Sequence, residues 1–151
     1  MTEPLRQDLL QTVHNAIGTV LSMNFALMGV EPGRVPPRGR TGNVRARAYL
    51  FGLTQGVMLQ FRSMSPTGEE LEAAFLNACA ATYGRTEWEW SCEAVLGWQR
   101  KRQDALDGVL IGNADAVELH SDKPWRSCTG LRLLTKGDEK AVRARLAELR
   151  A

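Results

Sequence analysis

Residues 9–30 contain no Asp, Glu, Lys or Arg, and this uncharged segment is the feature that most limits how the chain can fold. Leucine, valine and isoleucine recur in it at three- and four-residue spacing, which predicts an amphipathic helix over about residues 5–28. The opposite side of that helix is small and polar but uncharged, with Gln11, Asn15, Gly18 and Ser22. Because a solvated helix surface normally carries charges, we expect a second helix or another subunit to cover this side.

The same segment has the length of a membrane span, but seven polar residues interrupt it. Each of these groups would be costly to bury in lipid, so no membrane association is expected. The first eight residues contain Glu3 and Asp8 as well as Arg6, unlike the basic start of a signal peptide. The three cysteines are widely spaced and form no CxxC pair, which favours a reducing compartment, the cytoplasm.

Directly after the uncharged segment, residues 32–68 contain no acidic residue. They contain six arginines: Arg34, Arg38, Arg40, Arg45, Arg47 and Arg62. Such a cluster can neutralise the phosphates of a nucleic acid or bind another anionic surface. The alternative is that these arginines are solvated, or pair with the acidic starts of later helices. The net charge of +2 is too small to decide between the two.

The length of 151 residues fits a single domain with a sizeable core. Residues 31–43 hold three prolines and three glycines, which predicts an Arg/Pro/Gly-rich loop. The pattern of residues 44–61 predicts a helix, because the apolar stretch is long and has no turn signal. Gly52 and Gly56 belong to a stripe of small residues along this helix. Two glycines inside a helix cost about 1 kcal/mol each relative to alanine, so close packing must justify them.

Two capping-box patterns mark the next helices, Thr67 with Glu70 and Thr86 with Glu89. Leu71 and Phe75 share a face of the first helix, which Gly84 ends. One face of the second helix holds Trp88, Cys92, Val95 and Gln99.

The C-terminal third predicts a mixture of elements. Residues 109–119 resemble a hairpin with a Gly-Asn turn, or alternatively a short helix, and residues 131–135 resemble a strand. Asp138 predicts the start of a final helix that buries Val142, Leu146 and Leu149. The expected fold is therefore a mainly α bundle of four or more helices with a small β element near the C-terminus. An α+β fold with a hairpin at residues 44–62 is the alternative.

Three tryptophans, Trp88, Trp90 and Trp98, fall within eleven residues. Trp88 and Trp90 cannot share one face of a helix, so one of them is exposed or covered by another element. Tryptophan is favoured at the energetic centres of protein interfaces. The alternative is a structural helix that packs on two sides.

Few residues suggest catalysis. His120, Asp122 and Cys128 share one region, where a Cys-His pair could act as a nucleophile, but their spacing matches no family signature. No metal-ligand spacing and no phosphate loop occur, so no cofactor is expected.

The sequence thus favours a small non-enzymatic intracellular protein that binds a partner macromolecule or self-associates. Its expected binding residues are Arg34, Arg38, Arg40, Arg45, Arg47, Trp88, Trp90 and Trp98. A nucleic-acid-binding accessory protein is one alternative. A small enzyme that uses His120 and Cys128 is another.

Overall fold

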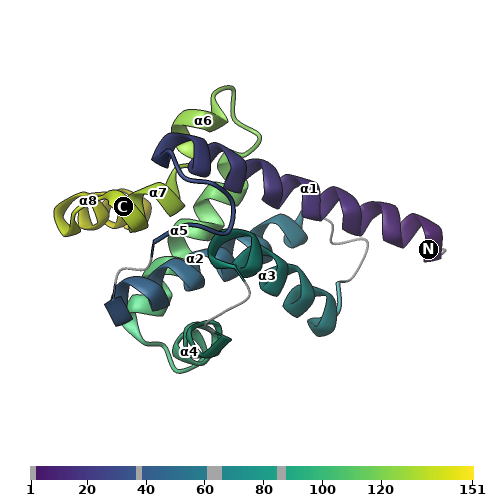
Figure 1. Cartoon of the computed structure of the whole chain (residues 1–151), viewed down its shortest axis with the longest axis horizontal. Helices are drawn as coiled ribbons and strands as arrows, with labels where there is room; N and C mark the ends of the chain where they lie inside the picture. The colour runs from purple at the N-terminus through teal and green to yellow at the C-terminus, as the bar shows by residue number, and fades with distance from the viewer. Residues whose placement is uncertain (1–2, 37–38, 61–65, 85–87) are drawn as a thin grey trace.

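The structure is a computed structural model that describes residues 3–36, 39–60, 66–84 and 88–151. Within these ranges it is entirely helical, which confirms the mainly α prediction (Figure 1). The helices are α1 (Glu3–Met28), α2 (Gly39–Leu59), α3 (Gly68–Tyr83), α4 (Trp88–Gln99), α5 (Gln103–Glu118), α6 (Pro124–Ser127), α7 (Gly130–Lys136) and α8 (Glu139–Arg150). None of the described helices is long and apolar enough to cross a membrane.

The predicted β elements are wrong. Residues 109–118 lie inside α5, and residues 131–135 lie inside α7. Both apolar runs are buried by neighbouring helices rather than by a sheet, and a short apolar run does not separate the two cases. The hairpin considered for residues 44–62 is also wrong, since α2 continues through residue 59.

A close contact between α2 and α5 forms the centre of the fold. Four glycines line it, Gly52 and Gly56 on α2 and Gly108 and Gly112 on α5. A Cβ added at Gly52 would lie 2.7 Å from the Cα of Val109, and one at Gly112 would lie 2.6 Å from the backbone nitrogen of Leu53. The backbones of α2 and α5 therefore approach more closely than side chains would allow. This close packing explains why α2 contains Gly52 and Gly56.

The remaining helices surround this pair. α2 contacts α1, α3, α4 and α7 as well as α5, and residues 46–54 are buried without interruption. A helix that is buried on all sides needs no polar face, which accounts for the ambiguous pattern of residues 44–61. One apolar cluster contains residues from α1 to α5 and from α7 and α8.

Helix α1 buries Val13, Ile17, Val20, Leu21 and Phe25 and ends in a Schellman motif at Gly29. In that motif, Val30 N–H donates to the carbonyl of Phe25 and Gly29 N–H to that of Ala26. The other side of α1 is not covered by another helix of the described chain: Gln11, Asn15 and Ser22 are exposed, and nothing lies within 4 Å of a Cβ added at Gly18. Whether another subunit covers it stays a prediction.

The connection from α1 to α2 is shorter than predicted, because α2 begins at Gly39 rather than after residue 43. Its described part is tied to the end of α3: Gly33 N–H donates to Ala81 O (2.6 Å) and Val35 N–H to Thr82 O (3.2 Å). Helix α3 has the predicted capping box of Thr67 and Glu70, and α8 begins with the predicted Asp138 cap. Thr86 of the second predicted box lies outside the described residues.

Candidate functional site: an apolar groove between α3 and α4

An apolar groove of about 420 Å³ opens between α3 and α4. Its floor is Phe51 of α2, and its walls come from one face of each flanking helix. The lining residues are Phe51, Gly68, Leu71, Glu72, Phe75, Leu76, Trp88, Ser91, Cys92, Val95, Leu96 and Gln99. The face predicted for Trp88, Cys92, Val95 and Gln99 is therefore confirmed as one wall.

The groove exists because α3 and α4 both pack on α2 but make few contacts with each other. Phe51 lies between them, with its ring edge-on to that of Phe75 at a centroid distance of 5.4 Å. The ring of Trp98 approaches Phe51 from the α4 side at 5.1 Å. These aromatic contacts anchor each helix to α2. The two helices are joined directly by a buried hydrogen bond from Ser91 Oγ to Cys79 Sγ (3.4 Å), and the groove opens beside it.

Large apolar side chains at the edge of the groove are exposed. Trp88 is 56% exposed and Leu96 is 45% exposed, both on α4. A second hollow shares Gly68 and Leu71 with the groove and ends at Leu59, which is 59% exposed. An exposed apolar surface that is continuous over several elements is typical of interaction sites.

One of Trp88 and Trp90 is expected to be exposed or covered by another element, and Trp88 is the exposed one. Trp90 and Trp98 are partly buried and pack against the core, and only Trp88 has an exposed ring that also lines the groove. Sequence reasoning missed Leu96 and Phe51. The spacing of Leu96 from Cys92 on the groove face could have indicated the first, but nothing local indicates that Phe51 forms a floor for two later helices.

Acidic residues accompany the groove. Among the described residues that line it, Glu72 is the one with a charge, and Glu69 and Glu89 are exposed in the first turns of α3 and α4. Glu70, by contrast, is engaged twice, by its capping box and by an ion pair with Arg6, and the Arg6 contact is the main reason that its pKa is lowered.

One of the three cysteines lies in the groove. Cys92 is half-buried there and is a free thiol. Cys79 and Cys128 are buried, and burial raises the pKa of Cys79 to about 11 and that of Cys128 to about 12. Thiolates are the reactive form, so Cys79 and Cys128 are chemically inert near neutral pH.

The three arginines of the predicted site whose side chains the structure describes, Arg34, Arg45 and Arg47, do not share one surface. Arg34 is exposed, whereas Arg47 is 1% exposed in the core, where it donates to Asn43 Oδ1 (2.9 Å) and lies over the Tyr83 ring at 4.0 Å. Arg38 and the side chain of Arg40 lie outside the described residues.

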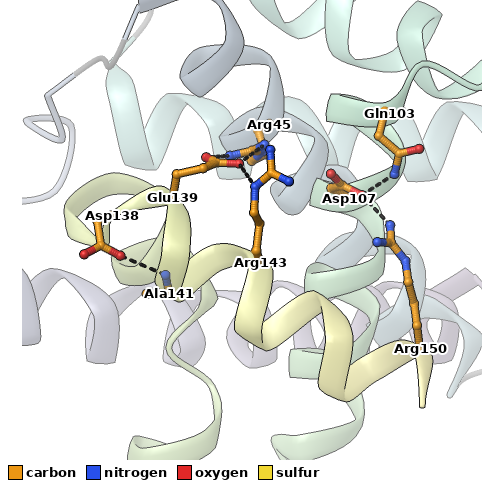
Figure 2. A network of polar contacts seen from close by, with 8 residues as sticks. All are labelled: Arg45, Gln103, Asp107, Asp138, Glu139, Ala141, Arg143 and Arg150. Carbon is orange, nitrogen blue, oxygen red and sulfur yellow. Dashed lines mark hydrogen bonds and ion pairs between the residues drawn. The ribbon is translucent and has the colours of Figure 1, made fainter.

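Arg45 belongs to a different neighbourhood, the polar contact between α8 and the α2–α5 pair (Figure 2). Its guanidinium donates to both carboxylate oxygens of Glu139, at 2.9 and 3.3 Å, and Arg143 joins the same carboxylate. Beside this cluster, Asp107 accepts from Gln103 and Arg150. These ion pairs hold α8 in place. Because Arg45 is already paired with Glu139, it has little charge to offer an anionic partner.

The residues considered for nucleophilic catalysis have separate structural roles. The Cys128 thiol donates to the Asp115 carbonyl (3.2 Å), and His120 Nε2 forms a hydrogen bond with Gln60 Oε1 (2.7 Å). Asp122 is exposed, and His14 is half-buried on α1. Among the described residues, no group of three His, Cys, Asp or Glu side chains could hold a metal ion.

No protein-family model, curated protein or solved structure matches this chain.

Proposed function

We propose that this chain is a protein-interaction module whose groove between α3 and α4 receives an amphipathic helix of a partner protein. The observation that carries the proposal is the open apolar groove itself, with Phe51 as its floor and exposed Trp88 and Leu96 at its edge. Amphipathic helices bind such grooves by inserting apolar residues at three- and four-residue spacing. Trp88 supplies the kind of large, partly exposed aromatic side chain that dominates binding energy.

The charges around the groove specify the partner further. Glu69, Glu72 and Glu89 are exposed, and Glu72 lines the groove. We therefore expect a helix whose apolar face is flanked by Lys or Arg, since complementary charges steer association and select the partner. The three free cysteines support a reducing compartment, the cytoplasm, as the place of this binding.

The test begins with capture of partners by tagged protein from the cells in which it is made, with Leu96→Asp as the groove variant. Val117→Asp is the matched control, because Val117 is also exposed (71%) but lies on α5 outside the groove lining. We expect a partner that is retained by the wild type and the control but lost from Leu96→Asp. Equal retention by all three proteins, or recovery only of further copies of this chain, would contradict the proposal.

Cys92 then provides a direct readout of groove occupancy. A thiol reagent should modify Cys92 alone in the folded protein, because Cys79 and Cys128 are buried with raised pKa values. A synthetic peptide of the captured partner's basic amphipathic helix should slow this modification by about tenfold at saturation, since a bound helix covers the thiol. An unchanged rate with bound peptide would show that the partner binds elsewhere.

A further inference from the structure

Residues 123–137 form a second segment without acidic residues, and its cations lie differently from those of the first. It carries four cations, Lys123 and Arg126 on the α6 side and Arg132 and Lys136 on α7, and all four are exposed. We propose that these exposed cations of α6 and α7, called here the α6–α7 surface, bind the phosphate backbone of a nucleic acid. This surface is separate from the groove and does not depend on the function proposed for it.

None of these four cations has an acidic partner among the described residues, a property that they share with the exposed Arg34, Arg100, Lys101 and Lys140. Several other arginines are engaged in ion pairs: Arg6 with Glu70, Arg45 with Glu139, Arg102 with Asp104, Arg145 with Glu148, and Arg150 with Asp107. A cation that is already paired gains little from an incoming phosphate. The α6–α7 cations make no such ion pair among the described residues and can therefore pair with the phosphates of a ligand.

Two of the cations border a hollow of about 190 Å³ on the exposed side of α7. Its lining consists of Thr129, Arg132, Leu133, Lys136 and Gly137, with no acidic residue. Arg132 and Lys136 are four residues apart and therefore about 6 Å apart along the helix axis. A guanidinium and an ammonium group at this spacing can contact one phosphate from two sides or two successive phosphates.

Buried side chains from two other helices fix the backbone of this segment. Asn24 of α1 is 0% exposed; its Nδ2 donates to Cys128 O (2.8 Å) and its Oδ1 accepts from Arg132 N–H (2.9 Å). Asp115 of α5 accepts from Gly130 N–H (2.8 Å). The cations of α7 are thus attached to a backbone that the core holds in place, which reduces the ordering cost of binding.

The number of cations favours a polymer over a single phosphate. Four charges over two successive elements can meet several phosphates at once, and each contact releases condensed counterions from a nucleic acid. This release makes the affinity fall with salt by a slope of about −0.9 per contact on duplex DNA, so four contacts predict a slope between about −3 and −4.

The test is fluorescence anisotropy of the full chain with a labelled duplex of about 20 base pairs and the matching single strand, from about 50 to 200 mM salt. We compare the wild type with Arg132→Glu/Lys136→Glu. Arg100→Glu/Lys101→Glu is the control, because it makes the same charge change at two exposed cations after α4. The α7 variant should bind at least about tenfold more weakly with a salt slope smaller by about 2, and the control should stay within about twofold.

A second variant, Lys123→Glu/Arg126→Glu, tests the α6 half of the surface if the α7 variant fails to fold. Leu96→Asp should bind the oligonucleotides like the wild type, which separates this proposal from that of the groove. No binding at about 50 mM salt would overturn the proposal, as would an equal loss in the control variant. Binding to anionic phosphatidylserine vesicles without binding to either oligonucleotide would replace the nucleic acid by a membrane surface.

Discussion

At the scale of single residues, Asp115 is the buried group with the largest consequences. It is 1% exposed, and one of its carboxylate oxygens, Oδ2, accepts both from the Tyr49 hydroxyl (2.7 Å) and from Gly130 N–H (2.8 Å). Burial raises its pKa to about 6, although both hydrogen bonds act in the opposite direction. Desolvation therefore outweighs two good hydrogen bonds, and the folded protein carries a carboxylate that is costly to ionise.

This residue predicts a pH dependence of stability. The unfolded chain should release the Asp115 proton near the ordinary value of 3.8, whereas the folded chain holds it to about pH 6. The folded state binds more protons in that window, so stability is greatest below it and falls as the pH rises through it. The unfolding free energy that this group contributes should fall by on the order of 3 kcal/mol by about pH 7. Urea unfolding at several pH values measures this loss.

Asp115→Asn supplies the comparison. An amide oxygen at the Oδ2 position can keep both hydrogen bonds without any charge, so the variant should lack this part of the pH dependence. It should also be more stable than the wild type at about pH 7. If the wild type and Asp115→Asn show parallel stability curves from about pH 4 to 7, Asp115 does not titrate as described.

Arg47 shows where sequence reasoning fails for single residues. An arginine in a basic, acid-free stretch is expected at the surface, but Arg47 lies in the core between Asn43 and the ring of Tyr83. The burial depends on a partner in another helix, far along the chain. No local pattern reports such a partner, and the same limit applies to Arg45 and its pairing with Glu139.

At the scale of elements, local signals were good predictors where they act locally. The Thr67–Glu70 capping box and the Asp138 cap both appear as predicted, because each is a hydrogen bond within one turn of its helix. The Gly-Asn pair at residues 112 and 113 was misleading. Gly112 does not form a turn; it lets the backbone of α5 approach that of α2.

Gly112→Ala and Gly18→Ala test this explanation with opposite expected signs. At Gly112 the new Cβ would lie 2.6 Å from Leu53 N, so the helices must separate and the variant should lose more than about 2 kcal/mol of unfolding free energy. At Gly18 nothing lies within 4 Å, so alanine should add about 0.5–1 kcal/mol through its higher helix propensity. Thermal and urea unfolding measure both, and a stable Gly112→Ala variant would contradict the close contact.

At the scale of the whole molecule, the groove is a property of three helices together. The sequence identified the apolar faces of α3 and α4, because periodicity within a helix is local. It could not show that the two faces flank a space instead of packing together, since that depends on Phe51 in α2 and on the angle between helices. The position of the groove therefore follows from tertiary packing alone.

A pair of variants separates the groove surface from the frame beneath it. Trp88→Ala should lower the unfolding free energy by less than about 1 kcal/mol, because the ring is more than half exposed. Phe51→Ala should cost about 3–5 kcal/mol, because its ring is 6% exposed and contacts both Phe75 and Trp98. Chemical denaturation gives both values, and a large loss in Trp88→Ala would mean that Trp88 supports the fold instead of the binding surface.

The glycine contact between α2 and α5 also has a consequence for how this protein can change over time. The two helices are neighbours in space although residues 60–102 separate them in the chain. That intervening stretch, which includes α3 and α4, leaves the central pair and returns to it. The groove walls on α3 and α4 can therefore acquire new side chains, and with them new binding preferences, while the four glycines of the α2–α5 contact stay unchanged. For folding, mutational tolerance should be higher at the exposed groove residues Trp88 and Leu96 than at the four glycines of the central pair.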